Sequence, residues 1–179
     1  VWTAPRPQSM MVKSQAWWAS VPEIPDTATV KQALTVAEVA EAGKVVPKKL
    51  SLRRRSSGNY KKGIVTWNGL RISIETPAGH WRIGKKENGK LWFTKMRDAY
   101  GYIQRHEGYD GDAVDVFLGP DLDSPWVHVV NQTDGKSNTF DEVKCVIGCH
   151  TEAEARLLYM RNYTEIGRAS CRERVYHPV

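Results

Sequence analysis

The chain has 179 residues, of which 41% are hydrophobic. This is enough for one domain with a core of its own, and the apolar fraction is ordinary for a globular protein. No apolar run is long enough to cross a bilayer, and residues 1–20 lack the continuous apolar segment of a secretory signal, so we expect no membrane contact of either kind.

Three cysteines without framework spacing favour reduced thiols and a cytoplasmic setting. The sequence begins with Val rather than Met, which favours a piece of a larger multidomain chain.

The formal net charge of +6 suggests a nucleic-acid partner until it is divided along the chain. Residues 1–62 hold 11 basic and 4 acidic side chains, residues 63–165 hold 12 and 15, and residues 166–179 hold 3 and 1. The basicity therefore belongs to the two ends, and the middle of the chain is mildly acidic.

The first segment is predicted to be a basic, poorly ordered linker over residues 1–62 with one helix. Residues 27–43 predict an amphipathic helix that ends at Gly43. The next 19 residues, 44–62, carry eight Lys or Arg and no acid. Such a run could hold phosphate backbones of nucleic acid without sequence preference. We favour a solvated linker instead, because no base-stacking aromatic residues are interleaved through the run.

The middle segment, residues 63–165, predicts a mainly β domain of the α+β type. Two β-rich hairpins are expected around Asn68-Gly69 and Asn88-Gly89, since Asn-Gly tolerates the positive φ angles of tight turns. Strands are also predicted near residues 115–119, 126–132 and 140–148. Short strands at this spacing favour a small antiparallel barrel or sandwich. Trp92 and Phe93 are expected to fill its interior.

One helix is predicted to pack on these strands. Thr151 and Glu154 form a capping box, and the helix they begin places Ala155, Leu158, Tyr159 and Asn162 on one face. Before it, Cys145, Cys149 and His150 are spaced C-x3-C-H. That pattern lacks the second ligand pair of a zinc site, so the thiols are predicted to lie in the core.

The stretch YDGDAVDVFLGP, residues 109–120, concentrates Asp110, Asp112 and Asp115 directly before a predicted buried strand. A bend at Gly111 would let the three carboxylates converge at one end of the domain while alternate apolar residues of the strand point inward. Carboxylates this close repel one another, and a hard divalent cation is the usual remedy. An acidic turn without a ligand is the alternative. A calcium-binding EF-hand fits poorly, because no helices flank the loop.

The longer stretch YGYIQRHEGYDGDAVDVFLGP resembles the soluble inorganic pyrophosphatases, which have an acidic D-G-D-x-x-D-V motif after a Y-G-Y-I strand. The resemblance covers residues 69–163 and is closest to the pyrophosphatase-like domain of polyvalent proteins of phages and mobile elements. It implies a small OB-like antiparallel β-barrel with a peripheral C-terminal helix. It also implies Mg²⁺-dependent hydrolysis of pyrophosphate to phosphate by metal-activated water.

By the same resemblance, functional roles fall on named positions. Asp112 is the expected general base, with Tyr100 and Lys144 in the catalytic group. Metal ligation is expected from Asp110, Asp115, Asp134, Asp141 and Glu142, of which one of the last two is the family ligand. Substrate contacts are expected from Arg82, Lys95, Tyr100, Lys144 and Tyr163, with Glu75 as a further acidic residue of the site. Arg82 and Lys95 each exchange one basic type for the other relative to the family, and Thr164 replaces a usual lysine.

Two alternative functions stay open. One is hydrolysis of a nucleotide phosphoanhydride. The other is an inactive barrel that serves as a nucleic-acid or protein binding module, with nonspecific nucleic-acid contact through residues 44–62.

The last segment, residues 166–179, is predicted to be a non-native tail. Its first ten residues, IGRASCRERV, are the translation of ATC GGA AGA GCG TCG TGT AGG GAA AGA GTG, a common short-read sequencing adapter. The natural sequence would then leave this reading near Glu165, and Cys171 would carry no biology.

Overall fold

The computed structural model describes residues 33–85, 89–108, 111–133, 139–163 and 172–176, all within one unit of the chain, residues 33–179. Its helices are α2 (Val36–Gly43), α3 (Leu52–Ser56) and α4 (Glu152–Arg161). Its strands are β1 (Gly63–Trp67), β2 (Leu70–Thr76), β3 (Trp81–Lys85), β4 (Leu91–Lys95), β5 (Ala99–Glu107), β6 (Ala113–Leu118), β7 (Val127–Thr133), β8 (Phe140–Ile147) and β9 (Arg172–Tyr176). The predicted mainly β fold with a peripheral helix is confirmed.

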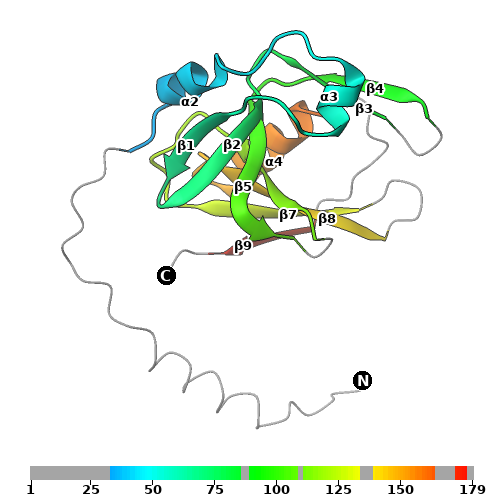
Figure 1. Ribbon diagram of the computed structural model, residues 1–179. Helices are drawn as coiled ribbons and strands as arrows, with labels where there is room; N and C mark the ends of the chain where they lie inside the picture. Colours follow the sequence, from blue (N-terminus) through cyan, green and yellow to red (C-terminus); the bar gives the residue numbers. More distant parts are fainter. Residues whose placement is uncertain (1–32, 86–88, 109–110, 134–138, 164–171, 177–179) are drawn as a thin grey trace. The chain divides into compact units, whose positions relative to one another are not determined.

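Seven strands form one sheet in the order β1-β2-β5-β6-β8-β7-β9, and β3 pairs only with β4. Figure 1 shows β7, β8 and β9 crossing steeply to the direction of β5, so the sheet bends sharply along its length. All pairings are antiparallel except that of β6 with β8, which is parallel. The described ranges of the chain contain no ladder that closes this sheet, and barrel closure stays a prediction.

The core lies on both faces of the sheet, because side chains alternate along each strand. On β6, Val116 and Leu118 pack in one buried cluster, beside Val39 of α2. Phe117, between them, packs in a second buried cluster with Leu158 of α4. The second face also carries the polar residues of the candidate site.

Both predicted hairpins are present. Asn68 and Gly69, with φ angles of 43° and 85°, join β1 to β2 in the predicted two-residue turn. β3 and β4 form the second hairpin, whose residues 86–88 lie outside the described part of the chain. The β-rich pattern and the Asn-Gly signals were therefore sufficient to locate four strands.

The outer face of the β3–β4 hairpin corrects one expectation. Gly84 lies opposite Trp92 in the register, and a Cβ atom at Gly84 would come within 2.2 Å of the Trp92 ring. Trp92 thus covers the glycine on the inner face. Phe93, which was expected in the interior, is 56% exposed because the register turns it to the opposite face.

The helices begin where capping residues place them. α4 begins after Thr151, whose capping box with Glu154 is formed as predicted, and the predicted apolar face is buried. α2 ends at Gly43 as predicted but is shorter than expected, because Thr35 caps its start through a second capping box with Glu38.

The C-terminal end of α4 is tied to the start of β5. Asn162 accepts hydrogen bonds from the backbone N–H groups of Arg97 and Asp98, at 2.8 and 3.2 Å. Its side-chain amide also donates to Asp98 Oδ2 at 2.8 Å and to the Leu158 carbonyl at 2.8 Å. A single buried amide therefore fixes two segments that are more than sixty residues apart in the sequence.

Strand β9 pairs along the free edge of β7. An open strand edge accepts almost any extended segment, so this pairing does not decide the origin of residues 166–175. No helix in the described part of the chain combines the length and apolar character needed to cross a membrane.

Candidate active site

The candidate site is built by strand alternation on the face of the sheet that α4 covers in part. Asp115 of β6 lies directly beside Tyr102 of β5 and Lys144 of β8 in the register. Tyr100 follows two positions from Tyr102, on the same face of β5. The sequence pattern that buries Val116 and Leu118 on one face thus directs Asp115 to the other.

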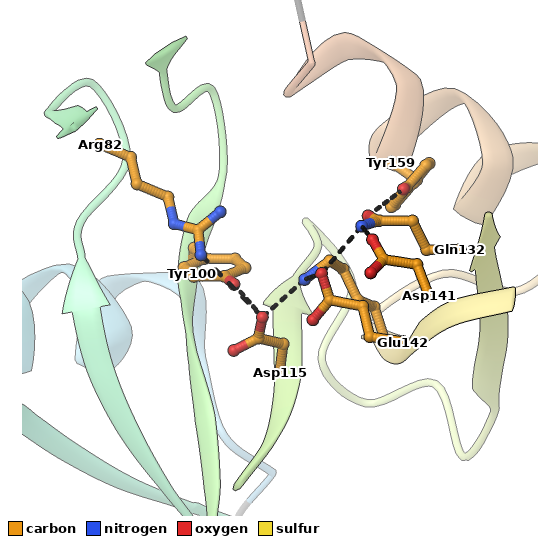
Figure 2. Close-up of polar contacts among 8 residues, drawn as sticks. Arg82, Tyr100, Asp115, Gln132, Asp141, Glu142 and Tyr159 are labelled. Atoms are coloured by element: carbon orange, nitrogen blue, oxygen red, sulfur yellow. Dashed lines mark hydrogen bonds and ion pairs between the residues drawn. The ribbon is translucent and has the colours of Figure 1, made fainter. Parts of the chain in front are cut away.

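Lys144 is the centre of the cluster. Its side chain is only 2% exposed, and its ammonium lies 2.6 Å from Asp115 Oδ2 and 2.8 Å from Glu142 Oε1. The Tyr100 hydroxyl donates a hydrogen bond to the same oxygen of Asp115. Figure 2 shows these groups in a continuous chain of polar contacts. A lysine buried this deeply requires such partners, because an unpaired buried charge is costly.

Arg82 reaches the cluster from outside the main sheet. It lies on the inner face of the β3–β4 hairpin, and its guanidinium stands 4.1 Å from the centre of the Tyr100 ring and 5.3 Å from that of Trp92. It is also 4.0 Å from Asp115 Oδ2. The aromatic faces and the carboxylate together hold the guanidinium at one orientation over β5.

Gln132 extends the cluster toward α4. Its amide donates to Asp141 Oδ2 at 2.7 Å and to Glu142 Oε1 at 2.8 Å, and its carbonyl accepts from the Tyr159 hydroxyl at 2.8 Å. Figure 2 shows Gln132 between the two carboxylates and the helix. Sequence reasoning missed Gln132 and Tyr159. The only available signal was the position of Gln132 near the predicted hairpin that carries both acids.

A second ion pair lies at the edge of this face. Lys62 approaches Glu75 Oε1 at 3.5 Å and lies over the rings of Tyr60 and Tyr102, at 4.8 and 5.4 Å from their centres. Burial raises the pKa of Glu75, and the Lys62 ammonium opposes this rise. Burial, reinforced by the charge of Glu75, raises the pKa of Tyr60 to about 12. Lys62 was assigned to the basic run and not to the site.

The remaining buried groups keep their protons. Burial raises the pKa of Tyr100 well above its usual value, and that of Tyr163 is also raised, again chiefly by burial. Burial alone would lower the pKa of Arg82, but Tyr100, Asp115, Tyr163 and Glu75 together raise it. The site therefore presents neutral phenols as hydrogen-bond donors and a permanently charged guanidinium.

Several predicted residues lie elsewhere or outside the described residues. Asp112 is exposed immediately before β6, where its carbonyl accepts a 2.6 Å hydrogen bond from the Gly108 N–H. Asp110 and Asp134 lie outside the described residues. Lys95 is directly opposite Trp81 in the hairpin register, whereas Arg82 is opposite Thr94. Lys95 therefore faces away from Arg82, on the outer side of the hairpin, and it does not join the Asp115 cluster.

The carboxylates have the donor chemistry of a magnesium site. The contacts from Tyr100, Lys144 and Arg82 all go to Oδ2 of Asp115, and within the described ranges no partner contacts its Oδ1. An oxygen of this kind is a hard donor suited to Mg²⁺. The described residues do not bring three acidic, histidine or cysteine side chains close enough to hold a metal by themselves. Asp110 and Asp134, the two other predicted ligands, are not among them.

The two described cysteines are buried free thiols, as predicted. Burial raises the pKa of both Cys145 and Cys149 to about 11. They are therefore protonated at neutral pH, unlike thiolates that ligate zinc.

A mainly β domain that gathers carboxylates, buried cations and neutral phenols on one sheet face is suited to a polyanion accompanied by divalent cations. A sequence model of the family described as Inorganic Pyrophosphatase matches residues 53–173. The match covers more than half of the chain, and the chain belongs to this family. Comparison with curated proteins and with solved structures gave no significant match.

Proposed function

We propose that the domain hydrolyses inorganic pyrophosphate to phosphate in a Mg²⁺-dependent reaction. The observation that carries the proposal is the contact cluster of Tyr100, Asp115 and Lys144, in a chain that belongs to the inorganic pyrophosphatase family. Each of these three residues stands at a position that the acidic motif and its neighbouring strands predict.

The cations and phenols of the site would bind the substrate. Arg82 presents a planar guanidinium that can hold two phosphate oxygens at once, while the Lys144 ammonium acts as a point charge beside them. Tyr100 and Tyr163 remain protonated and can donate to phosphate oxygens. Because Lys144 already neutralises Asp115 and Glu142, pyrophosphate would have to enter together with further positive charge.

Metal ligation is proposed for Asp115, for Asp110 and Asp134, and for Asp141 or Glu142. When bound, Mg²⁺ neutralises substrate charge and lowers the pKa of a coordinated water. Asp112 would accept the proton of the attacking water, and its exposure before β6 keeps it accessible to solvent. Gln132 would hold Asp141 and Glu142 in position, since its amide contacts both.

The test is phosphate release from pyrophosphate by the full chain, with and without Mg²⁺. We expect Mg²⁺-dependent turnover that Asp112→Asn lowers by two or more orders of magnitude, on the order of the loss of a general base. Asp123→Asn is the matched control, because Asp123 is an exposed carboxylate in the turn after β6. Equal rates for both variants and the wild-type chain would refute the assignment of Asp112.

The same assay separates the two enzymatic substrates. Turnover of ATP with none of pyrophosphate would replace the proposed substrate with a nucleotide. No turnover of either, in a chain whose melting temperature rises with Mg²⁺, would favour a binding module over an enzyme.

A further inference from the structure

The outer side of the β3–β4 hairpin forms a second functional surface, separate from the candidate active site. An open hollow of about 840 Å³ lies between this face and the segment that leads into α3. We call it the basic–aromatic groove, and its walls include Lys48, Lys49, Arg55, Trp81, Ile83 and Phe93. None of the described residues that line it is acidic.

The aromatic residues of the groove are exposed to an unusual degree. Trp81 is 55% exposed and Phe93 is 56% exposed, although large aromatic side chains are ordinarily mostly buried. Both lie on the same face of the hairpin, because Trp81 is opposite Lys95 and Phe93 is opposite Ile83 in the register. They are diagonal neighbours about 7–8 Å apart, which leaves each ring free to stack on a separate planar group.

The cations of the groove come from the basic run of residues 44–62. Arg55 donates a hydrogen bond of 3.3 Å from Nη1 to the Trp81 carbonyl, which fixes α3 beside β3. Lys48, Lys49, Arg53 and Arg54 are exposed around this contact. Figure 1 shows α3 lying beside the β3–β4 hairpin. The basic run contains no aromatic residue at its centre, but the fold supplies two from the hairpin.

We propose that the basic–aromatic groove binds single-stranded nucleic acid. Positive side chains that follow a phosphate backbone, combined with exposed rings on which bases stack, are the two components of such sites. The bases of a duplex are already stacked on one another and cannot reach the rings, so the geometry favours a single strand over a double strand. The groove lies on the hairpin face opposite to Arg82, and its occupancy leaves the active site open.

The test is fluorescence anisotropy of a labelled 20-nucleotide oligo-dT with the full chain. The Trp81→Ala/Phe93→Ala variant should bind at least about 10-fold more weakly, since each stacked base contributes substantially to affinity. The Lys48→Ala/Lys49→Ala variant should bind more weakly and should reduce the salt dependence, with a slope of log K against log salt that is smaller by about 1.4. Trp81→Phe, which keeps a ring, should restore most of the affinity.

An Arg156→Ala/Leu157→Ala variant serves as the control, because both residues are exposed on α4, outside the groove. It should bind oligo-dT as the wild-type chain does. Unchanged affinity in the aromatic variant, equal affinity for duplex DNA, or no binding by the wild-type chain would overturn the proposal. Displacement of oligo-dT by poly-glutamate at equal charge concentration would also overturn it and would favour an acidic protein partner. Melting temperatures within error of the wild-type value exclude misfolding as the cause.

Discussion

Replacement of Lys144 by Met should destabilise the domain by about 3 kcal/mol. The ammonium neutralises Asp115 and Glu142 at 2.6 and 2.8 Å, and its loss leaves two carboxylates on one sheet face without that partner. Removing one member of a buried charged group costs about 3–5 kcal/mol. The lower end applies here, because the Asp115 and Glu142 side chains are 19% and 30% exposed and water can reach them.

Urea denaturation of the full chain measures this loss. Lys61→Met is the matched control, because Lys61 is exposed, and its substitution should change the free energy of unfolding by no more than about 0.5 kcal/mol. In an Asp115→Asn background the cost of Lys144→Met should fall by about 1 kcal/mol or more, since one of the two carboxylates is then neutral. A loss below about 1 kcal/mol in the native background, or strict additivity in the double variant, would refute the central position of Lys144.

Three further results are expected. With Cys171 replaced by Ser, the thiols of Cys145 and Cys149 should not react with a disulfide reagent at pH 8 until urea is added, because burial holds both pKa values near 11; rapid reaction in the folded state would contradict this. The pKa of Tyr60 is raised on folding to about 12, so stability should be complete below pH 10 and lost between pH 10 and 12. Tyr60→Phe should make that decline shallower in alkaline unfolding curves, and an identical decline would show that Tyr60 has no part in it. Gly101→Ala should prevent folding or cost about 3 kcal/mol or more, because a Cβ would lie 1.8 Å from a β2 carbonyl oxygen; a circular dichroism melt like that of the wild-type chain would contradict the close approach.

Local signals predicted the elements because each has a local cause. The Asn-Gly turns, the period-2 pattern and the capping box at Thr151 act over a few residues, and the structure follows them. The parallel pairing of β6 with β8 has no such signal, since it depends on where the chain returns after β7. The direction of Asp115 toward the polar face was predictable for the same reason as the elements, because the buried Val116 and Leu118 leave it the opposite side.

The position of Lys95 shows how a small error in register changes a site. A two-residue turn at Asn88-Gly89 would place Lys95 directly opposite Arg82, on one face. The structure pairs Arg82 with Thr94 and Lys95 with Trp81 instead, which is a shift of one residue. Because side chains alternate with a period of two, this shift moves Lys95 to the other face of the hairpin. The sequence predicts a hairpin here but does not specify its register.

The partners Gln132, Tyr159 and Lys62 were beyond sequence reasoning for a different cause. Each contacts the site through a segment that is distant in the sequence, and none is acidic or part of a motif. Their roles depend on side-chain packing between elements, which a pattern of residue types does not encode.

The hydrogen bonds of Asn162 have a consequence for how the protein is made. This amide, which fixes the backbone just before β5, belongs to nearly the last residue of α4. During synthesis, β5 and the residues of the acidic motif leave the ribosome well before Asn162 does. The strand that carries Tyr100 therefore waits, without its anchor, until the end of the domain has been translated, and we expect its final ordering to be among the last events of folding.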